Sequence, residues 1–158
     1  MSEVLFLIGL TLLPFLELRA SIPYGIFQTD LSLLSIFLIC TLTNLLLAPL
    51  IYFFLDNLIH LFLRIKFIDK YYQKIILRTQ KRIHPYVEKY GLLGLAIFIG
   101  IPLPGSGVYT GALGAYLLGF KFKDFFKAAF IGVLIAAFLV TLIATTGNTA
   151  FQFLIKKI

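Results

Sequence analysis

The stretch LPFLELRASIPYGI, residues 13–26, places a glutamate and an arginine two positions apart inside an apolar region. A charged side chain such as Arg costs about 2.5–3.5 kcal/mol near the centre of a membrane helix, so intramembrane charges usually face a partner or water. Pro14 and Pro23 flank Glu17 and Arg19 and predict that a helix is interrupted here. A broken apolar segment that carries two opposite charges therefore decides how the rest of the chain is interpreted.

The whole chain has the composition of a membrane protein. Hydrophobic residues make up 60% of its 158 positions and charged residues 13%, an apolar share beyond that of soluble domains. Two uncharged runs, 31–55 and 128–146, are long enough as helices to cross a hydrocarbon core of about 30 Å. The first residues lack the basic start and cleavage site of a signal peptide, so we expect them in the mature protein. The sequence predicts an all-α integral membrane protein.

Three other apolar blocks are too short to cross the membrane, because as helices they would reach only about half the hydrocarbon core or slightly more. Each lies next to a helix breaker, either Glu17–Pro23 or the PLPGSG stretch at 102–107. Two short helices joined by a break predict a re-entrant hairpin, whose irregular backbone is tolerated at membrane depth only against protein or a wet cavity. The three blocks are residues 4–16, 91–101 and 108–119.

The order of short block, break, short block and full span occurs twice. We predict a first repeat at 4–55 and a second repeat at 91–147, within a single membrane domain that covers 1–158. The connector at 57–90 is rich in Lys and Arg, which predicts a cytoplasmic position, and its apolar residues have the spacing of an amphipathic surface helix. The two repeats then have opposite topology, as in secondary transporters that bind substrate at the repeat interface.

Two interpretations of the charged pair are open. In the functional one, Arg19 holds an anionic group and Glu17 carries an exchangeable proton, since an apolar site favours a neutral carboxyl group. In the structural one, the pair closes the turn as an ion pair or lies at the membrane interface. Ionisable residues within the membrane are usually functional, which favours the first interpretation. Asn44, inside the first span, would hydrogen-bond between helices or line the cavity.

The second break lies in GIPLPGSGVYTGALGAYLLG, residues 100–119. Its glycines, including the GxxxG at 107–111, predict close helix packing. A helix that starts near Val108 would also turn free N–H groups toward the cavity, where they could bind an anionic head group. Hydroxyl groups of nearby residues could add contacts. The candidate binding residues of this break are Pro102, Pro104, Gly105, Ser106, Gly107 and Thr110.

The charge pattern and the reactive side chains argue against other classes of function. The net charge of +7 comes from Lys and Arg between apolar blocks, which indicates membrane orientation rather than nucleic-acid binding. His60 and His84 have no third ligand at metal spacing, and no catalytic motif is apparent. Cys40 is the single cysteine, so no intramolecular disulfide forms. We expect neither enzyme activity nor a metal or cofactor.

Two motifs carry a family resemblance. PFLELRASIPYGI at 14–26 and FIGIPLPGSGVYTGALGAYLLGF at 98–120 together resemble the putative small multi-drug export family, and more distantly the DedA superfamily. The DedA resemblance implies an inverted repeat with two re-entrant hairpins, and some of its members are proton-coupled flippases for polyprenyl phosphates or lipid scramblases. DedA proteins place arginines around the proline of the second hairpin, whereas this chain has none there. The resemblance points to Glu17, Arg19, Pro23, Pro102, Pro104, Gly105 and Gly107.

Together these observations predict a transporter or flippase that moves an amphiphilic substrate between leaflets. The substrate class that we expect is an anionic lipid or lipid-linked phosphate, with proton coupling through Glu17. One alternative is a proton-coupled exporter of small cationic or apolar compounds, and another is a membrane scaffold that transports nothing. The expected partners are membrane lipids and a second copy of the chain, since two spans shelter two hairpins poorly. The family resemblance implies a multi-pass protein of a prokaryotic inner membrane.

Overall fold

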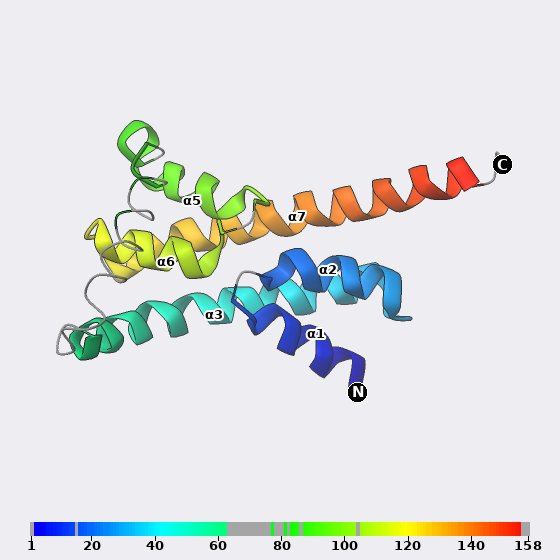
Figure 1. The fold of residues 1–158 in the computed structure, drawn as a ribbon, viewed down its shortest axis with the longest axis horizontal. Coiled ribbons are helices and arrows are strands. Elements are labelled where there is room, and N and C mark those ends of the chain that lie inside the picture. Colours follow the sequence, from blue (N-terminus) through cyan, green and yellow to red (C-terminus); the bar gives the residue numbers. More distant parts are fainter. Residues whose placement is uncertain are drawn as a thin grey trace.

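The regular elements in the described part of the chain are all α-helices. The computed structural model describes residues 2–14, 16–62, 77, 81, 83–85, 87–103 and 105–155. Two short helices precede a long one, and this succession then occurs a second time (Figure 1). The helices are α1 (Ser2–Leu12), α2 (Glu17–Gln28), α3 (Leu33–Phe62), α5 (Leu92–Gly100), α6 (Val108–Leu117) and α7 (Phe122–Ile155).

Both long helices are suited to crossing a membrane. The segments Leu33–Leu55 of α3 and Phe122–Gly147 of α7 combine sufficient length with an apolar composition. At about 1.5 Å per residue, either segment exceeds a hydrocarbon core of about 30 Å. The long apolar helices predicted at 31–55 and 128–146 are therefore confirmed. α7 begins earlier than predicted because the charged residues before its apolar part, such as Lys123, are good helix formers.

The short helices follow the predicted apolar blocks, but the first break lies elsewhere. α1 ends at Leu12, and the described residues 13, 14 and 16 between it and α2 form the α1–α2 turn. The prediction that Glu17–Pro23 is the break was wrong, since this segment forms the first turns of α2. Pro14 accounts for the earlier break, because the residue before a proline disfavours helical geometry. Pro23 lies within α2, where its missing N–H leaves one helical hydrogen bond unmade.

The arrangement of the helices brings the two interruptions of the chain together. α3 and α7 pack side by side and run in opposite directions (Figure 1). The α1–α2 pair and the α5–α6 pair lie against them from opposite ends, and their turns meet in the middle of the molecule. We call residues 101–107 the α5–α6 break. The amphipathic helix predicted within the connector at 57–90 lies largely outside the described residues.

Small residues allow α5 and α7 to approach closely. A Cβ atom built on Gly132 would lie 2.7 Å from the backbone oxygen of Ala96 and 2.7 Å from Cβ of Ile99. The same kind of contact holds α6, since a Cβ on Gly111 would lie 2.5 Å from Ile99 Cγ1. The close helix packing predicted from the glycines therefore occurs within the chain.

We expect Gly132→Ala to lower the free energy of unfolding by about 1–3 kcal/mol, because the added methyl group overpacks a contact with backbone. Gly147→Ala on the same helix is the matched control, since nothing lies within 4 Å of a Cβ at that position. Thermal unfolding in detergent micelles, followed by circular dichroism, measures both. Equal unfolding temperatures for the two variants would contradict this account of the α5–α7 contact.

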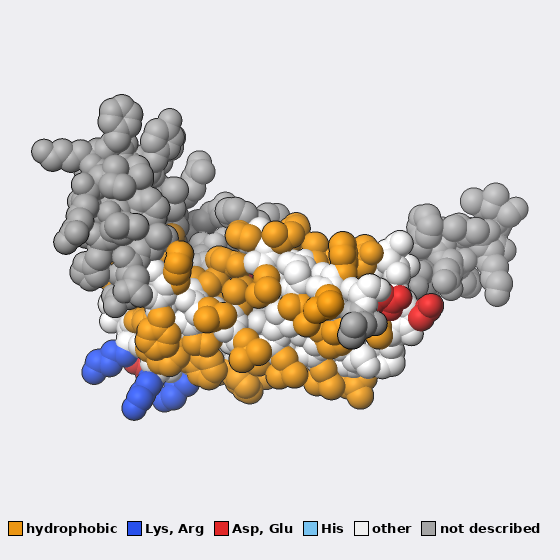
Figure 2. Space-filling view, turned by 90° about the horizontal axis from the view of Figure 1, so that it is seen from below, with side chains coloured by type: hydrophobic (Ala, Val, Ile, Leu, Met, Phe, Trp, Pro, Cys, Tyr) orange, Lys and Arg blue, Asp and Glu red, His pale blue; other side chains and the backbone are white. Residues whose placement is uncertain are grey.

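The surface consists of an apolar belt between charged ends. Figure 2 shows hydrophobic side chains over the middle of one face, with Lys and Arg gathered at one end and most of the visible Asp and Glu at the other. The start of α7 contributes exposed Lys121 and Lys123, whereas Glu3 and Asp30 are exposed at the opposite end. Tyr52 stacks on Phe125 and contacts the ring of Phe122 near the lysines of α7, and tyrosines are enriched at membrane interfaces. These surface features and the two candidate spans are those expected of a membrane protein.

Candidate functional site

Glu17 caps the N-terminus of α6 from across the molecule. Its Oε2 accepts a hydrogen bond from the backbone N–H of Val108 at 3.2 Å, and its Oε1 accepts one from Tyr109 at 3.3 Å. The side chain is 3% exposed, and a carboxylate there complements the positive end of the helix dipole. We predicted that these N–H groups would face the cavity unoccupied. That prediction was wrong, because the chain supplies its own carboxylate.

The backbone and a neighbouring glycine are both adapted to this contact. Glu17 has a φ of 48°, a left-handed conformation that costs a non-glycine residue about 1–2 kcal/mol. A Cβ on Gly107 would lie 2.5 Å from Glu17 Oε2, so a side chain at that position would push the carboxylate away. A strained backbone that persists beside a buried charge is typical of functional sites.

Arg19 performs the complementary role at the C-terminus of α5. Its Nη2 donates to the carbonyl oxygens of Ile99 at 3.2 Å and Ile101 at 3.0 Å, and to Ser106 Oγ at 3.2 Å. Ser106 in turn donates to the carbonyl oxygen of Ile101 at 2.6 Å. A cation at a helix C-terminus stabilises the negative end of the dipole. The α5–α6 break is thus held by one charge of each sign.

The two charges do not pair with each other. Within the described part of the chain, Glu17 and Arg19 form no salt bridge, although both lie in the first turn of α2. Residues two apart on a helix point to different sides, so one reaches α6 and the other reaches α5. The expectation that they form an ion pair was wrong. Their spacing instead lets Glu17 reach the start of α6 and Arg19 reach the end of α5, the two helix ends at the α5–α6 break.

Tyr109 adds another hydrogen bond between the α5–α6 pair and the α1–α2 pair. Its hydroxyl donates to the carbonyl oxygen of Leu12, at the C-terminus of α1, at 2.5 Å. The backbone groups exposed by each interruption are therefore bonded by side chains from the other helix pair, as irregular backbone at membrane depth requires. Sequence reasoning missed Tyr109, because nothing in the sequence shows which carbonyl group a distant tyrosine will reach.

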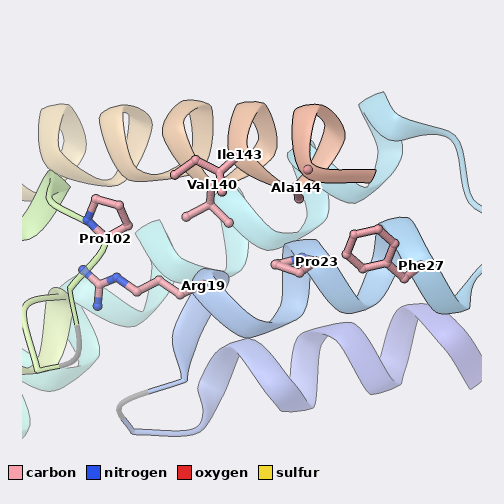
Figure 3. A pocket seen from close by; sticks show the side chains of 8 residues that line it. Arg19, Pro23, Phe27, Pro102, Val140, Ile143 and Ala144 are labelled. Atoms are coloured by element: carbon pink, nitrogen blue, oxygen red, sulfur yellow. The ribbon is translucent and has the colours of Figure 1, made fainter. Parts of the chain in front are cut away.

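A groove of about 400 Å³ lies beside this network, between α2 and the second half of α7. Figure 3 shows Arg19 extending toward Pro102 at one end of the groove, with Phe27 at the other. Among the described residues that line it, Arg19 is the one that carries a charge, and its Nε is buried without a hydrogen-bond partner in the described part of the chain. We use "the groove" for the space lined by Arg19, Pro23, Phe27, Pro102, Val140, Ile143, Ala144 and Gly147.

The structure divides the candidate residues predicted from the sequence into two groups. Asn44 is 1% exposed and donates from Nδ2 to Glu17 Oε2 at 3.4 Å, so it joins Glu17 and Gly107. The groove and its Arg19 end bring together a second group. Its predicted members are Arg19, Pro23, Pro102 and Ser106.

Two described candidates, Gly105 and Thr110, belong to neither group. Gly105 forms the turn within the α5–α6 break, with a φ of 76° that favours glycine. Thr110 on α6 is partly buried but belongs neither to the described hydrogen-bond network nor to the groove lining. Pro104 lies outside the described residues. Sequence reasoning also missed the α7 wall of the groove, since Val140, Ala144 and their neighbours resemble any apolar span.

Comparison with known proteins identifies one family. A family model described as "putative small multi-drug export protein" matches residues 17–139. The match begins at the charged pair and extends through the α5–α6 break into α7. No curated protein and no solved structure matches the chain.

Proposed function

The chain belongs to the putative small multi-drug export family, and on that premise we propose that it exports amphiphiles whose polar end is anionic. Membership and the two long apolar helices indicate a membrane exporter. The observation that carries the substrate class is the position of Arg19, which is the one cation among the described residues of an otherwise apolar groove lining. An apolar tail would lie along α2 and α7 while a phosphate or carboxylate reaches the guanidinium group. An anionic lipid or lipid-linked phosphate has this shape.

The proposed architecture is an inverted repeat of two re-entrant hairpins, α1–α2 and α5–α6, each followed by a span. The meeting of their turns and the opposite directions of α3 and α7 support it (Figure 1). The lysines at the start of α7 favour placing that end in the cytoplasm of an inner membrane. Alternate opening of the hairpins would expose the groove to one side at a time.

The positions of Glu17 and Arg19 favour an anionic substrate over a cationic one. In a cation exporter, Glu17 would have to face the substrate, but its carboxylate is bonded to α6 and lies outside the groove. Arg19, by contrast, lines the groove, and its buried Nε has no hydrogen-bond partner among the described residues. Proton coupling through Glu17 and assembly as a homodimer are further parts of the proposal.

Obstruction of the groove tests this function. Gly147 lines the groove, and nothing lies within 4 Å of a Cβ built there, so the larger side chain of Gly147→Leu is expected to take up space in the groove. We expect leaflet translocation of a fluorescent phosphatidylglycerol in proteoliposomes to slow about tenfold or more, since overpacking a binding space costs about 1–3 kcal/mol. Gly9→Leu on α1 is the matched control, because that position is equally open.

Parallel assays with ethidium identify the alternatives. Protein-dependent movement of this cation without movement of the anionic lipid would replace our substrate class with a cation exporter. Movement of neither probe by folded protein would favour a scaffold. Equal slowing of lipid movement by Gly147→Leu and Gly9→Leu would show that the groove is not the route.

A further inference from the structure

The guanidinium group of Arg19 divides its donors between the α5–α6 break and the groove. Its Nη2 donates to the carbonyl oxygens of Ile99 and Ile101 and to Ser106 Oγ, at 3.2, 3.0 and 3.2 Å. This nitrogen carries two hydrogens, so three acceptors at these distances occupy both. Arg19 Nε is buried without a hydrogen-bond partner in the described part of the chain. An anion in the groove is therefore left with Nε and Nη1.

This division removes the geometry by which an arginine recognises the shape of an anion. A guanidinium group binds carboxylate or phosphate through two parallel N–H groups, either those of Nη1 and Nη2 or those of Nε and Nη2. Both pairs need a hydrogen of Nη2, which the α5–α6 break occupies. Nε and Nη1 form no such pair, because Cδ lies on the side that they share. Arg19 therefore offers an anion its charge and single hydrogen bonds.

The rest of the described groove lining adds no directed donor (Figure 3). It consists of Pro23, Phe27, Pro102 and four residues of α7, none of which has a side-chain N–H or O–H. The two prolines lack a backbone N–H, and the other backbone N–H groups lie within helices, where they bond to carbonyl groups. Ser106, at the Arg19 end, is 5% exposed and donates to the carbonyl oxygen of Ile101 at 2.6 Å. The described lining therefore provides no set of contacts that would fit one head group only.

We infer that the groove selects its substrate by negative charge and an apolar tail, and does not discriminate between anionic head groups. The class that fits is an amphiphile with one negative charge, whose head is a carboxylate, a sulfonate or a phosphodiester. The tail contributes by burial of apolar surface along α2 and α7, which has no directional requirement. This inference rests on the proposed function and specifies how Arg19 recognises the substrate.

A series of head groups on one tail tests the inference. The probes are nonanoate, octane-1-sulfonate and octyl methyl phosphate, which share the same alkyl chain and each carry a single negative charge at neutral pH. Each is titrated calorimetrically into the full chain in phosphatidylcholine nanodiscs, and empty nanodiscs give the blank. We expect the three dissociation constants to agree within about tenfold, because each additional directed hydrogen bond to a charged group would add about tenfold or more.

Three variants identify what Arg19 contributes. Arg19→Gln should weaken the binding of all three anions about 30-fold or more, because their charge loses its partner. Arg19→Lys keeps the charge without parallel N–H groups, so it should weaken all three by one common factor. A loss at least tenfold larger for nonanoate than for the sulfonate would show that Arg19 uses a parallel pair. Lys123→Ala is the matched control for lost positive charge, since Lys123 is exposed and lies outside the groove, and it should bind like wild type.

The outcomes distinguish this inference from the proposed function. A wild-type preference of more than about tenfold for one head group, with binding that requires Arg19, would overturn the inference alone. Failure of wild-type protein to bind any of the three anions, or unchanged binding by folded Arg19→Gln, would overturn both. If an Arg19 variant does not fold, judged by gel filtration, the wild-type series still decides, since a strong preference for one head group overturns the inference.

Discussion

Glu17→Ala is expected to lower the free energy of unfolding by about 2–4 kcal/mol, the sum of a lost helix cap and newly unsatisfied buried groups. The backbone N–H groups of Val108 and Tyr109 would lose their acceptors, and Asn44 Nδ2 would lose its own. The site is buried, so water cannot replace the carboxylate. This is the largest effect on stability that we expect from a single truncation.

Denaturant titration in micelles, followed by circular dichroism, measures this change. Glu17→Gln should cost less than Glu17→Ala, because the amide oxygen still accepts one of the two backbone hydrogen bonds. Glu3→Ala is the matched control, as Glu3 is an exposed carboxylate in the first turn of α1. If Glu17→Ala and Glu3→Ala unfold at the same denaturant concentration, the carboxylate does not hold α6.

Arg19→Ala is expected to have the largest effect on transport, a slowing of anionic lipid translocation by about 30-fold or more. Removal of one member of a buried charge pair costs about 2–5 kcal/mol, and here the pair is the guanidinium group and the proposed substrate anion. The carbonyl oxygens of Ile99 and Ile101 would also lose a donor, which reduces stability. Arg19→Lys keeps the charge but not the planar group, so it should be intermediate.

Translocation rates must be compared at equal amounts of folded protein, because Arg19 has both roles. Lys123→Ala serves as the control for loss of positive charge, since Lys123 is exposed at the start of α7 and lies outside the groove. If folded Arg19→Ala moves the anionic lipid at the wild-type rate, Arg19 only caps α5. The proposal of an anionic substrate would then have to be abandoned.

Much of the helical arrangement follows from local patterns. The apolar runs predicted α3 and α7, and the cluster of Pro and Gly at 102–107 predicted where α5 ends and α6 begins. The first break was misplaced, because Pro14 and Pro23 are equally able to interrupt a helix in isolation. Tertiary contacts decide between them, since α2 has to begin at Glu17 for its first turn to reach both ends of the α5–α6 break.

The partners within the site could not be predicted from the sequence. Intramembrane charge identified Glu17 and Arg19 as important, but most of the contacts they make are with backbone groups 80 or more residues further along the chain. Backbone N–H and C=O groups occur at every position, so no residue type marks the ones that a side chain will cap. Asn44 was recognised as a polar residue in a span, whereas its position against Glu17 depends on how α2 packs on α3.

The most direct test of the central claim, that Arg19 selects anions in the groove, is charge selectivity in proteoliposomes. Leaflet translocation of fluorescent phosphatidylglycerol and phosphatidylcholine with the same acyl chains is compared for wild type and Arg19→Gln. Our account predicts faster movement of the anionic lipid by wild type and loss of this preference in the variant. Equal rates for both lipids in wild type, or a preference that survives in folded Arg19→Gln, would contradict it.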